Sequence, residues 1–318
     1  MAIFLTEQDI ADLLSYEAAI PLIEEGFRMM GTGDAQSPVK IRIPTEKGFL
    51  QFGPGVVSAK QAIGFKVWAN AGTPLRGVLN FLYDLETGAL QAIMQAYLLT
   101  KIRTAAVTSA AVKALSPESA STVGLFGSGK QADAQLAAIC MVRKVKRAVV
   151  YSRRRDPLVE FCRNASQRLG IEVQPAEEPA QAARDMDIIV TVTSASQPIV
   201  NKEWITKPGL IVAQGANHWH ERELDAAIVR DAKLITVDSL VQAQADGGDL
   251  LYPISKGMLD WRQVREIGDV LAGNVAVPDF NAGTILFKSH GIGLEDVVVS
   301  KHVYEAALKA GRGTALPM

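Results

Sequence analysis

The segment Gly127-Ser128-Gly129-Lys130-Gln131 has the residue types and spacing that hold a dinucleotide pyrophosphate. It follows the apolar run 122–126 and opens a stretch with helical patterning. Gly127 permits a tight turn, Gly129 lets the backbone approach the phosphates, and Ala132 is small enough for close packing of helix on strand. The pattern alone is weak evidence, but residues 148–151 read as a second strand about 20 residues further on. We therefore predict that all five residues of the segment contact a nucleotide.

The end of that second strand indicates which nucleotide is bound. The sequence there is Tyr151-Ser152-Arg153-Arg154-Arg155, where NAD-binding proteins normally carry a carboxylate for the ribose hydroxyls. Guanidinium groups pair with phosphate oxygens, and a serine hydroxyl does not repel a 2′-phosphate. Arginines after a strand also occur simply as a solvated loop. We predict that Ser152, Arg153 and Arg154 bind the cofactor, with NADP(H) preferred and NAD(H) as the alternative.

Three cations stand in apolar surroundings in the first third of the chain. Lys66 and Arg42 each alternate with apolar residues along a predicted strand, which by pattern alone indicates solvent-facing side chains. Arg103 is predicted in the first turn of a helix, where a cation opposes the helix dipole. It needs an anion nearby, which is either a bound carboxylate or a structural Glu or Asp.

Histidines near the carboxyl ends of later strands offer two further candidates. His218, His220, Glu221 and Glu223 fit no specific metal-binding spacing, and side chains at a helix start explain them more simply, so we predict no metal. His290 lies where the final strand meets a glycine-rich turn. Carboxyl ends of strands in a dinucleotide-binding sheet face the cofactor, so we predict that His290 contacts its nicotinamide side.

The elements that position these residues fall into two parts. Thr6 and Asp9 indicate a helix start, and two short helices are expected before Gly33. Residues 40–95 predict an antiparallel sheet with a hairpin at Thr87-Gly88. An alanine-rich helix follows, from Thr100 to Leu115, and the boundary is expected between residues 116 and 121.

Beyond that boundary strands and helices alternate, which predicts an α/β, doubly wound parallel sheet of the Rossmann type. The expected strands are 122–127, 147–152, 171–175, 187–193, 210–215, 234–238 and 284–289, with a helix at 221–232. A final helix, 294–310, is long enough to return to the first part. The predicted domains are 1–118 with 297–318, a smaller discontinuous α+β domain, and 119–296, the nucleotide-binding domain.

Composition limits the class of protein. At 318 residues the chain is long enough for two cores, and its 48% hydrophobic residues, 21% charged residues and net charge of −1 describe an ordinary globular protein. This balance argues against a nucleic-acid partner. Cys140 and Cys162 have no CxxC spacing and indicate thiols of a reducing compartment. The sequence has neither a signal-like start nor an apolar run of about 18 residues, so we expect a cytoplasmic protein that makes no membrane contact.

Taken together, the motifs resemble the ornithine cyclodeaminase and mu-crystallin family along nearly the whole chain. The stretches that carry the resemblance are 64–67, 84–88, 99–106, 127–132, 215–217 with 222–225, and 287–291. The resemblance implies a homodimer whose subunits have an N-terminal substrate-binding and dimerisation domain and a Rossmann domain. It also implies that Arg42 and Arg103 bind the substrate carboxylate and that Lys66 lies close to the reacting carbon, contrary to the pattern-based interpretation of Lys66 and Arg42. The cofactor residues that it adds are Thr104, Thr191, Val192, Thr193 and Ser289.

One departure from the family bears on the reaction. Cyclodeaminases of this family carry an aspartate at the catalytic position that Asn217 occupies here, and an amide cannot act as a base. We therefore expect an NAD(P)H-dependent reductase of a cyclic imino acid, a ketimine, or an NAD(P)-dependent dehydrogenase that oxidises a small L-amino acid. The alternatives are an ornithine cyclodeaminase-type lyase and a non-catalytic, crystallin-like NADP-binding protein. The segment Gln51-Phe52-Gly53-Pro54 also departs from its relatives, so the side-chain pocket is expected to differ.

Overall fold

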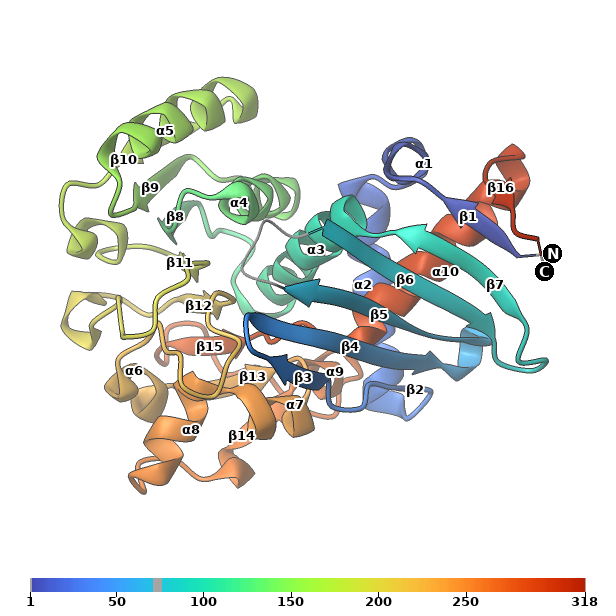
Figure 1. Ribbon diagram of the computed structural model, residues 1–318. Helices are drawn as coiled ribbons and strands as arrows, with labels where there is room; N and C mark the ends of the chain where they lie inside the picture. Colours follow the sequence, from blue (N-terminus) through green and yellow to red (C-terminus); the bar gives the residue numbers. More distant parts are fainter. Residues whose placement is uncertain (1, 71–75, 318) are drawn as a thin grey trace. The chain divides into compact units, whose positions relative to one another are not determined.

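A computed structural model of the protein describes residues 2–70 and 76–317 (Figure 1). The chain divides into two compact units, which we call the mixed-sheet unit, Met1–Val107 with Gly291–Met318, and the parallel-sheet unit, Thr108–His290. Both divisions were predicted later in the chain, after residue 118 and before residue 297. The observed first division falls inside one helix, Tyr97–Leu115, so its position is set by packing and not by a loop that the sequence could reveal.

The mixed-sheet unit is built on a sheet with the strand order β16-β1-β7-β6-β5-β4-β2, in which β3 pairs with β4. The longer strands are β3 (Ile41–Thr45), β4 (Gly48–Val57), β5 (Ala62–Asn70), β6 (Arg76–Asp84) and β7 (Leu90–Gln95). They are antiparallel as predicted, with the expected turn at Gly88, whose φ is +71°. Outside the predicted range, β1 (Ile3–Leu5) joins the sheet in parallel with β7, which makes the sheet mixed, and this strand was not predicted. The short strands β2 (Ala35–Gln36) and β16 (Thr314–Ala315) were also not predicted.

Helices cover one face of this sheet. The capping box of Thr6 and Asp9 opens α1 (Glu7–Leu13), and α2 (Tyr16–Thr32) is longer than the short helix predicted. Helix α10 (Gly293–Ala310) packs on β4, β5 and β6. A Cβ atom at Gly55 would lie 2.6 Å from the backbone nitrogen of Leu294, so glycine is what lets the start of α10 approach β4 this closely.

Helix α3 (Tyr97–Leu115) begins three residues before the predicted start at Thr100. The Glu7 carboxylate accepts hydrogen bonds from the backbone N–H groups of Tyr97 and Leu98, at 2.7 and 2.9 Å. This cap comes from about 90 residues away, so no local sequence signal marks it. As a result Arg103 lies in the second turn of the helix and not in the first.

The parallel-sheet unit confirms the predicted α/β, doubly wound fold. Its strand order is β10-β9-β8-β11-β12-β15-β13-β14, and its described pairs are all parallel. The strands are β8 (Thr122–Phe126), β9 (Arg147–Tyr151), β10 (Glu172–Pro175), β11 (Ile188–Thr191), β12 (Leu210–Ala213), β13 (Leu234–Val237), β14 (Val264–Glu266) and β15 (Ile285–Lys288). Only β14 was not predicted. The strand order reverses between β8 and β11, where ligands bind in such sheets.

Six described α-helices lie wholly in this unit: α4 (Lys130–Val142), α5 (Arg155–Leu169), α6 (Ala226–Asp231), α7 (Leu240–Asp246), α8 (Gly248–Ser255) and α9 (Ile267–Leu271). Helix α6 is shorter than the predicted helix at 221–232 because Asp225 caps its start. Cys140 and Cys162 are free thiols. No described helix is both long and apolar enough to cross a membrane. The cytoplasmic location stays a prediction.

Candidate active site

The glycine turn lies at the carboxyl end of β8, where the strand order reverses. Gly127 has φ +117°, and a Cβ atom there would lie 2.7 Å from the Val192 carbonyl oxygen, so only glycine fits without strain. Gly129 caps α4 without a side chain, and a Cβ atom there would meet no atom within 4 Å. This open cradle at the first N–H groups of a helix fits a pyrophosphate, as the sequence analysis predicts. Ala132 is fully buried, in the predicted packing position.

The end of β9 lies next to this turn, since the backbone N–H of Gly127 donates to the Tyr151 carbonyl at 2.8 Å. The side chains of Arg153 and Arg154 are exposed and form no ion pair within the described residues. Arg155 differs, because its guanidinium donates to the Ala176 carbonyl at 3.0 Å. Three exposed guanidinium groups therefore follow Ser152 beside the glycine turn, and only that of Arg155 is paired within the described residues.

The buried carboxylate of Glu223, considered from the sequence only as a metal ligand, ties β11 to β12. Glu223 is fully buried and accepts hydrogen bonds from the hydroxyls of Thr191 and Thr193 at 2.8 and 2.7 Å. It also accepts the backbone N–H groups of Gly215 and Ala216. The two threonine hydroxyls, predicted to face the cofactor, are thus held by Glu223. The predicted contacts of Thr191, Val192 and Thr193 with the nucleotide stay predictions.

The loop that carries Asn217 rests on a buried ion pair. Lys288 and Asp249 are fully buried, with 3.2 Å between the Lys288 Nζ and the Asp249 Oδ2. Lys288 also donates to the carbonyl oxygen of Ala216, immediately before the half-buried Asn217. The sequence signal for this pair is a lysine inside the apolar run of β15, which the sequence analysis did not use.

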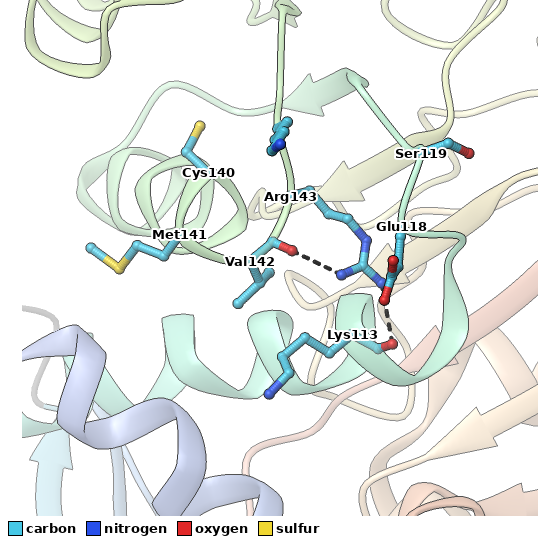
Figure 2. A pocket seen from close by; sticks show the side chains of 8 residues that line it. Lys113, Glu118, Ser119, Cys140, Met141, Val142 and Arg143 are labelled. Carbon is cyan, nitrogen blue, oxygen red and sulfur yellow. Dashed lines mark hydrogen bonds between the residues drawn. The ribbon is translucent and has the colours of Figure 1, made fainter.

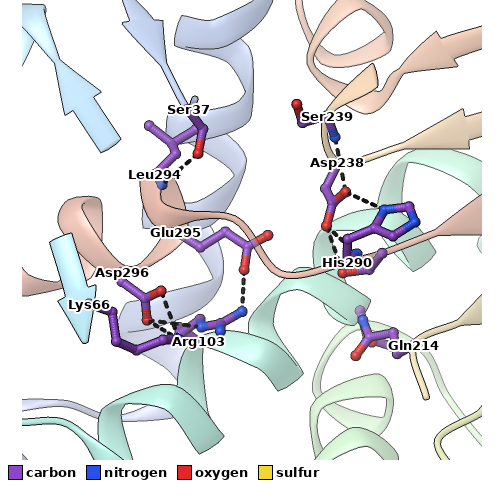
Figure 3. Close-up of polar contacts among 12 residues, drawn as sticks. Ser37, Lys66, Arg103, Gln214, Asp238, Ser239, His290, Leu294, Glu295 and Asp296 are labelled. Carbon is purple, nitrogen blue, oxygen red and sulfur yellow. Dashed lines mark hydrogen bonds and ion pairs between the residues drawn. The ribbon is translucent and has the colours of Figure 1, made fainter. Parts of the chain in front are cut away.

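Asp238 organises the end of β15. Its carboxylate accepts the Ser289 hydroxyl at 3.0 Å and the His290 backbone N–H at 2.6 Å, and it lies 3.1 Å from His290 Nδ1 (Figure 3). Both His290 and Ser289 are buried in this arrangement. Their predicted contact with the cofactor stays a prediction.

In the mixed-sheet unit, Lys66 and Arg103 share a carboxylate. The Lys66 Nζ lies 2.9 Å from Asp296 Oδ2, and the Arg103 Nε lies 3.1 Å from Asp296 Oδ1 (Figure 3). Arg103 Nη1 also bonds to Glu295. All four side chains are buried, which contradicts the pattern-based expectation of a solvent-facing Lys66. The structural anion considered for Arg103 is present, at residues 295 and 296.

Charge and burial act in opposite directions on Lys66. Burial and, next, the Arg103 guanidinium lower the pKa of Lys66, while Asp296 raises it, and together these effects bring the pKa of Lys66 to about 8. An ammonium with this pKa exchanges its proton close to neutral pH, as a proton-transfer group must.

Arg42 lies on β3 opposite Gln51 of β4. Its Nε and Nη2 donate to the Gln51 side-chain oxygen at 3.1 and 2.9 Å, and its guanidinium lies over the Phe49 ring. Gln51 and Gly53 share the buried face of β4, and Gly53 pairs with Lys66. Arg42 and Lys66 are therefore on the same face of the sheet. Thr104 follows Arg103 on α3, and its predicted contact with the cofactor stays a prediction.

Two other kinds of site can be compared with the described structure, a metal site and a surface hollow. Within residues 2–70 and 76–317, no group of three His, Cys, Asp or Glu side chains could hold a metal ion. A surface hollow of about 770 Å³ is lined by residues at the ends of α3 and α4 (Figure 2). There the Arg143 guanidinium donates to carbonyl oxygens at the end of α3, including those of Val112 and Ser116. It caps that helix, and none of the predicted site residues lines the hollow.

A model of the ornithine cyclodeaminase/mu-crystallin family matches residues 1–311. The chain belongs to this family. It is 33% identical to an alanine dehydrogenase of Archaeoglobus fulgidus, over 99% of this chain and 98% of that protein.

Solved structures of relatives agree over the whole chain. A Δ1-pyrroline-2-carboxylate reductase of Thermococcus litoralis, solved with NADH and L-proline, has a TM-score of 0.92 and 32% identity, covering 99% of this chain and 100% of that chain. An archaeal alanine dehydrogenase dimer with bound NAD has a TM-score of 0.93 and 31% identity, covering 100% of this chain and 99% of that chain. The resemblance inferred from the sequence and the predicted fold class are both confirmed.

Proposed function

We propose that this protein is an NAD(P)H-dependent oxidoreductase that reduces a cyclic imino acid, or in reverse oxidises a small L-amino acid. The observation that carries the proposal is the buried Lys66–Asp296–Arg103 cluster in the mixed-sheet unit. Relatives of similar length that are named for oxidation of alanine and reduction of pyrroline-2-carboxylate support it. The mixed-sheet unit would bind the substrate, and the parallel-sheet unit would bind the nucleotide.

The chemistry of such a substrate suits these side chains. A cyclic imino acid carries a carboxylate on the carbon of its C=N bond. Arg42 and Arg103 are proposed to hold that carboxylate and fix the carbon, because guanidinium groups bind carboxylates with defined geometry. The reduced nicotinamide supplies the hydride when bound. Lys66 is proposed to supply the proton for the nitrogen, so that C=N becomes CH–NH, and to take it back in amino-acid oxidation.

Asn217 favours this reaction over deamination. The cyclodeaminase reading needs a carboxylate at this position to act on the substrate amine, and an amide cannot accept that proton. The Lys288–Asp249 pair and Glu223 fix the backbone on which Asn217 stands. Imine reduction requires only that Asn217 bind the substrate or leave room for it.

Steady-state turnover tests the proposal. The substrates are Δ1-pyrroline-2-carboxylate and Δ1-piperideine-2-carboxylate with NADPH or NADH, and L-alanine and L-proline with the oxidised nucleotides. We expect turnover of at least one imine or amino acid. Release of ammonia and proline from ornithine would favour the lyase instead, and tight nucleotide binding with no turnover of any of these would favour the non-catalytic alternative.

The nucleotide is proposed to lie on the glycine turn, with Ser152, Arg153 and Arg154 at a 2′-phosphate. Relatives bind NAD and NADH, so a preference for NADP(H) rests on this chain's own residues. Replacing Ser152 by Asp is expected to raise the Kd for NADPH about tenfold or more, because a carboxylate repels the phosphate, and to leave the Kd for NADH little changed. Tryptophan fluorescence titration measures both constants.

Arg155→Gln is the matched control, since Arg155 contacts the Ala176 carbonyl. It should leave both constants close to those of the wild type. Equal weakening of NADPH and NADH in Ser152→Asp would contradict a phosphate-binding role.

The homodimer is proposed to form through the face of the mixed sheet opposite α10. Lys66 points to α10, so Phe65, its neighbour on β5, points to the opposite face. Phe65 stacks on Phe81 of β6 with ring centroids 4.9 Å apart, and it lies 6.3 Å from the Phe52 ring. Half-buried apolar residues continue this face on β4 and β5: Leu50, Pro54, Val56, Ile63 and Val67. A contiguous apolar sheet face of this kind suits a second copy.

Phe65→Asp is expected to raise the Kd for dimerisation about 100-fold or more, because it places a charge in the centre of an apolar contact. Sedimentation velocity over a concentration series measures this. Val159→Asp on α5, an exposed apolar position of the other unit, is the control and should leave the distribution unchanged. A folded Phe65→Asp protein with wild-type sedimentation would rule out this face.

A further inference from the structure

Asp296 contacts two cations with the two oxygens of one carboxylate. Its Oδ1 lies 3.1 Å from both the Lys66 Nζ and the Arg103 Nε, and its Oδ2 lies 2.9 Å from the Lys66 Nζ. Asp296 is 2% exposed, so water contributes little to either contact. It stands in the first turn of α10, where the helix dipole favours a negative charge.

We infer that Asp296 is the positioning residue of the active site, whose carboxylate holds the Lys66 ammonium and the Arg103 guanidinium side by side for the imine and the carboxylate of one substrate. This inference rests on the proposed function. Asp296 is not itself assigned to the substrate, and it acts through the two cations.

Electrostatics explain why such a residue is needed. Two positive groups that bind one small molecule must lie close together, and at low effective dielectric they repel each other strongly. The charged groups that face Lys66 in the described structure are Arg103 from α3 and Asp296 and Glu295 from α10. Arg103 and burial favour the neutral amine, whereas Asp296 and, less strongly, Glu295 favour the ammonium.

The three neighbours therefore set when Lys66 carries its proton. With Asp296 present, the pKa of Lys66 is about 8. When the charge of Asp296 is removed, burial and Arg103 are no longer opposed by the strongest neighbouring anion, so the pKa of Lys66 falls below this value. If Lys66 supplies the proton for imine reduction, kcat/KM falls as pH rises through the pKa of Lys66, and this fall must begin at lower pH in Asp296→Asn.

Three variants test the inference by their pH profiles of imine reduction. In Asp296→Asn, the fall in kcat/KM at alkaline pH is expected to lie about one pH unit lower or more, at a proton concentration that is about tenfold higher. Glu295→Gln, which removes the neighbouring carboxylate but leaves Asp296 on Lys66, should move it less. Asp296→Glu keeps the charge and adds a methylene, so it should keep the pH profile close to that of the wild type and raise KM for the imine. An unchanged KM in Asp296→Glu, or equal pH shifts in Asp296→Asn and Glu295→Gln, would overturn the inference.

A titration that needs no turnover separates this inference from the proposed function. Lysine labelled with ¹³C at Cε reports each side chain by NMR, and Lys66→Gln identifies the signal of Lys66. In the wild type that signal should titrate well below the other lysines, and in Asp296→Asn lower still. If the wild-type protein turns over none of the substrates but its Lys66 signal titrates at this lowered pH, and lower still in Asp296→Asn, the proposed reaction is refuted. The electrostatic role of Asp296 then remains intact. If Lys66 titrates at the same pH in folded Asp296→Asn as in the wild type, that role is refuted, whatever the turnover.

Discussion

Replacing Lys66 by glutamine is expected to lower kcat/KM for imine reduction about 100- to 10,000-fold, the usual contribution of a positioned acid or base. Glutamine can still donate a hydrogen bond to Asp296, but it carries no transferable proton. Most of the residues proposed to bind the nucleotide belong to the parallel-sheet unit, so the Kd for NADPH should stay within about twofold of the wild-type value. Steady-state kinetics and fluorescence titration measure the two effects.

Two companion variants show what Lys66 contributes. Lys60→Gln removes a partly exposed lysine that pairs with Glu25 at 2.9 Å, and it should leave kcat/KM unchanged. Lys66→Arg keeps the positive charge but holds its proton at any accessible pH. If Lys66 only attracts the substrate carboxylate, Lys66→Arg recovers most of the activity. If it transfers a proton, Lys66→Arg stays as impaired as Lys66→Gln. Wild-type kinetics in folded Lys66→Gln would remove Lys66 from the proposed mechanism altogether.

The parallel-sheet unit could be predicted closely from the sequence because its elements carry strong local signals. Central parallel strands are buried on both faces, so they appear as short apolar runs such as β8 and β12. The strict alternation of these runs with helical stretches fixes the doubly wound fold. The glycine turn is also visible in the sequence, because the backbone angle of Gly127 and its close approach to Val192 demand a residue without a side chain, and a glycine marks that position directly.

The mixed-sheet unit was predicted less well because its details depend on contacts between distant residues. Strands β1 and β16 have three and two residues, too few for alternation to be visible. The start of α3 is set by Glu7, which no local pattern connects to Tyr97. A one-turn error in that start changes the environment expected for Arg103, from a helix terminus to a helix interior.

The candidate site shows the same division. The sequence motifs identify Lys66 and Arg103 through the family resemblance, yet the pattern of β5 alone makes Lys66 a surface residue. What buries and pairs it is Asp296, which lies 230 positions further along the chain. Two adjacent acidic residues at the start of the final helix are the only sequence signal for this partner, and they have the equally ordinary role of favouring a helix N-terminus. Only the packing of α10 on β5 distinguishes the two roles.

Lys288→Met is expected to lower the free energy of unfolding by about 3–5 kcal/mol, the cost of leaving a buried charge without its partner. Lys288 and Asp249 have fully buried side chains, and Asp249 also accepts the backbone N–H groups of Glu223 and Leu224 at 2.8 and 3.0 Å. The Asp249 carboxylate therefore cannot turn to solvent without breaking these bonds. The substitution also removes the bond from Lys288 to the Ala216 carbonyl, which helps to fix the Asn217 loop. Urea denaturation followed by circular dichroism measures the loss.

A double variant and an exposed pair make this prediction specific. Asp249→Asn keeps a carbonyl oxygen that can accept the two backbone N–H groups while it removes the charge, so Lys288→Met combined with Asp249→Asn should recover much of the stability that Lys288→Met alone loses. Lys207→Met breaks an ion pair of 2.8 Å with Asp187 in which the side chains are 36% and 24% exposed. It should cost no more than about 1 kcal/mol, because water and salt screen such a pair. If Lys288→Met is no more destabilising than Lys207→Met, the buried pair does not support the Asn217 loop, and the choice between imine reduction and deamination must rest on residue 217 alone.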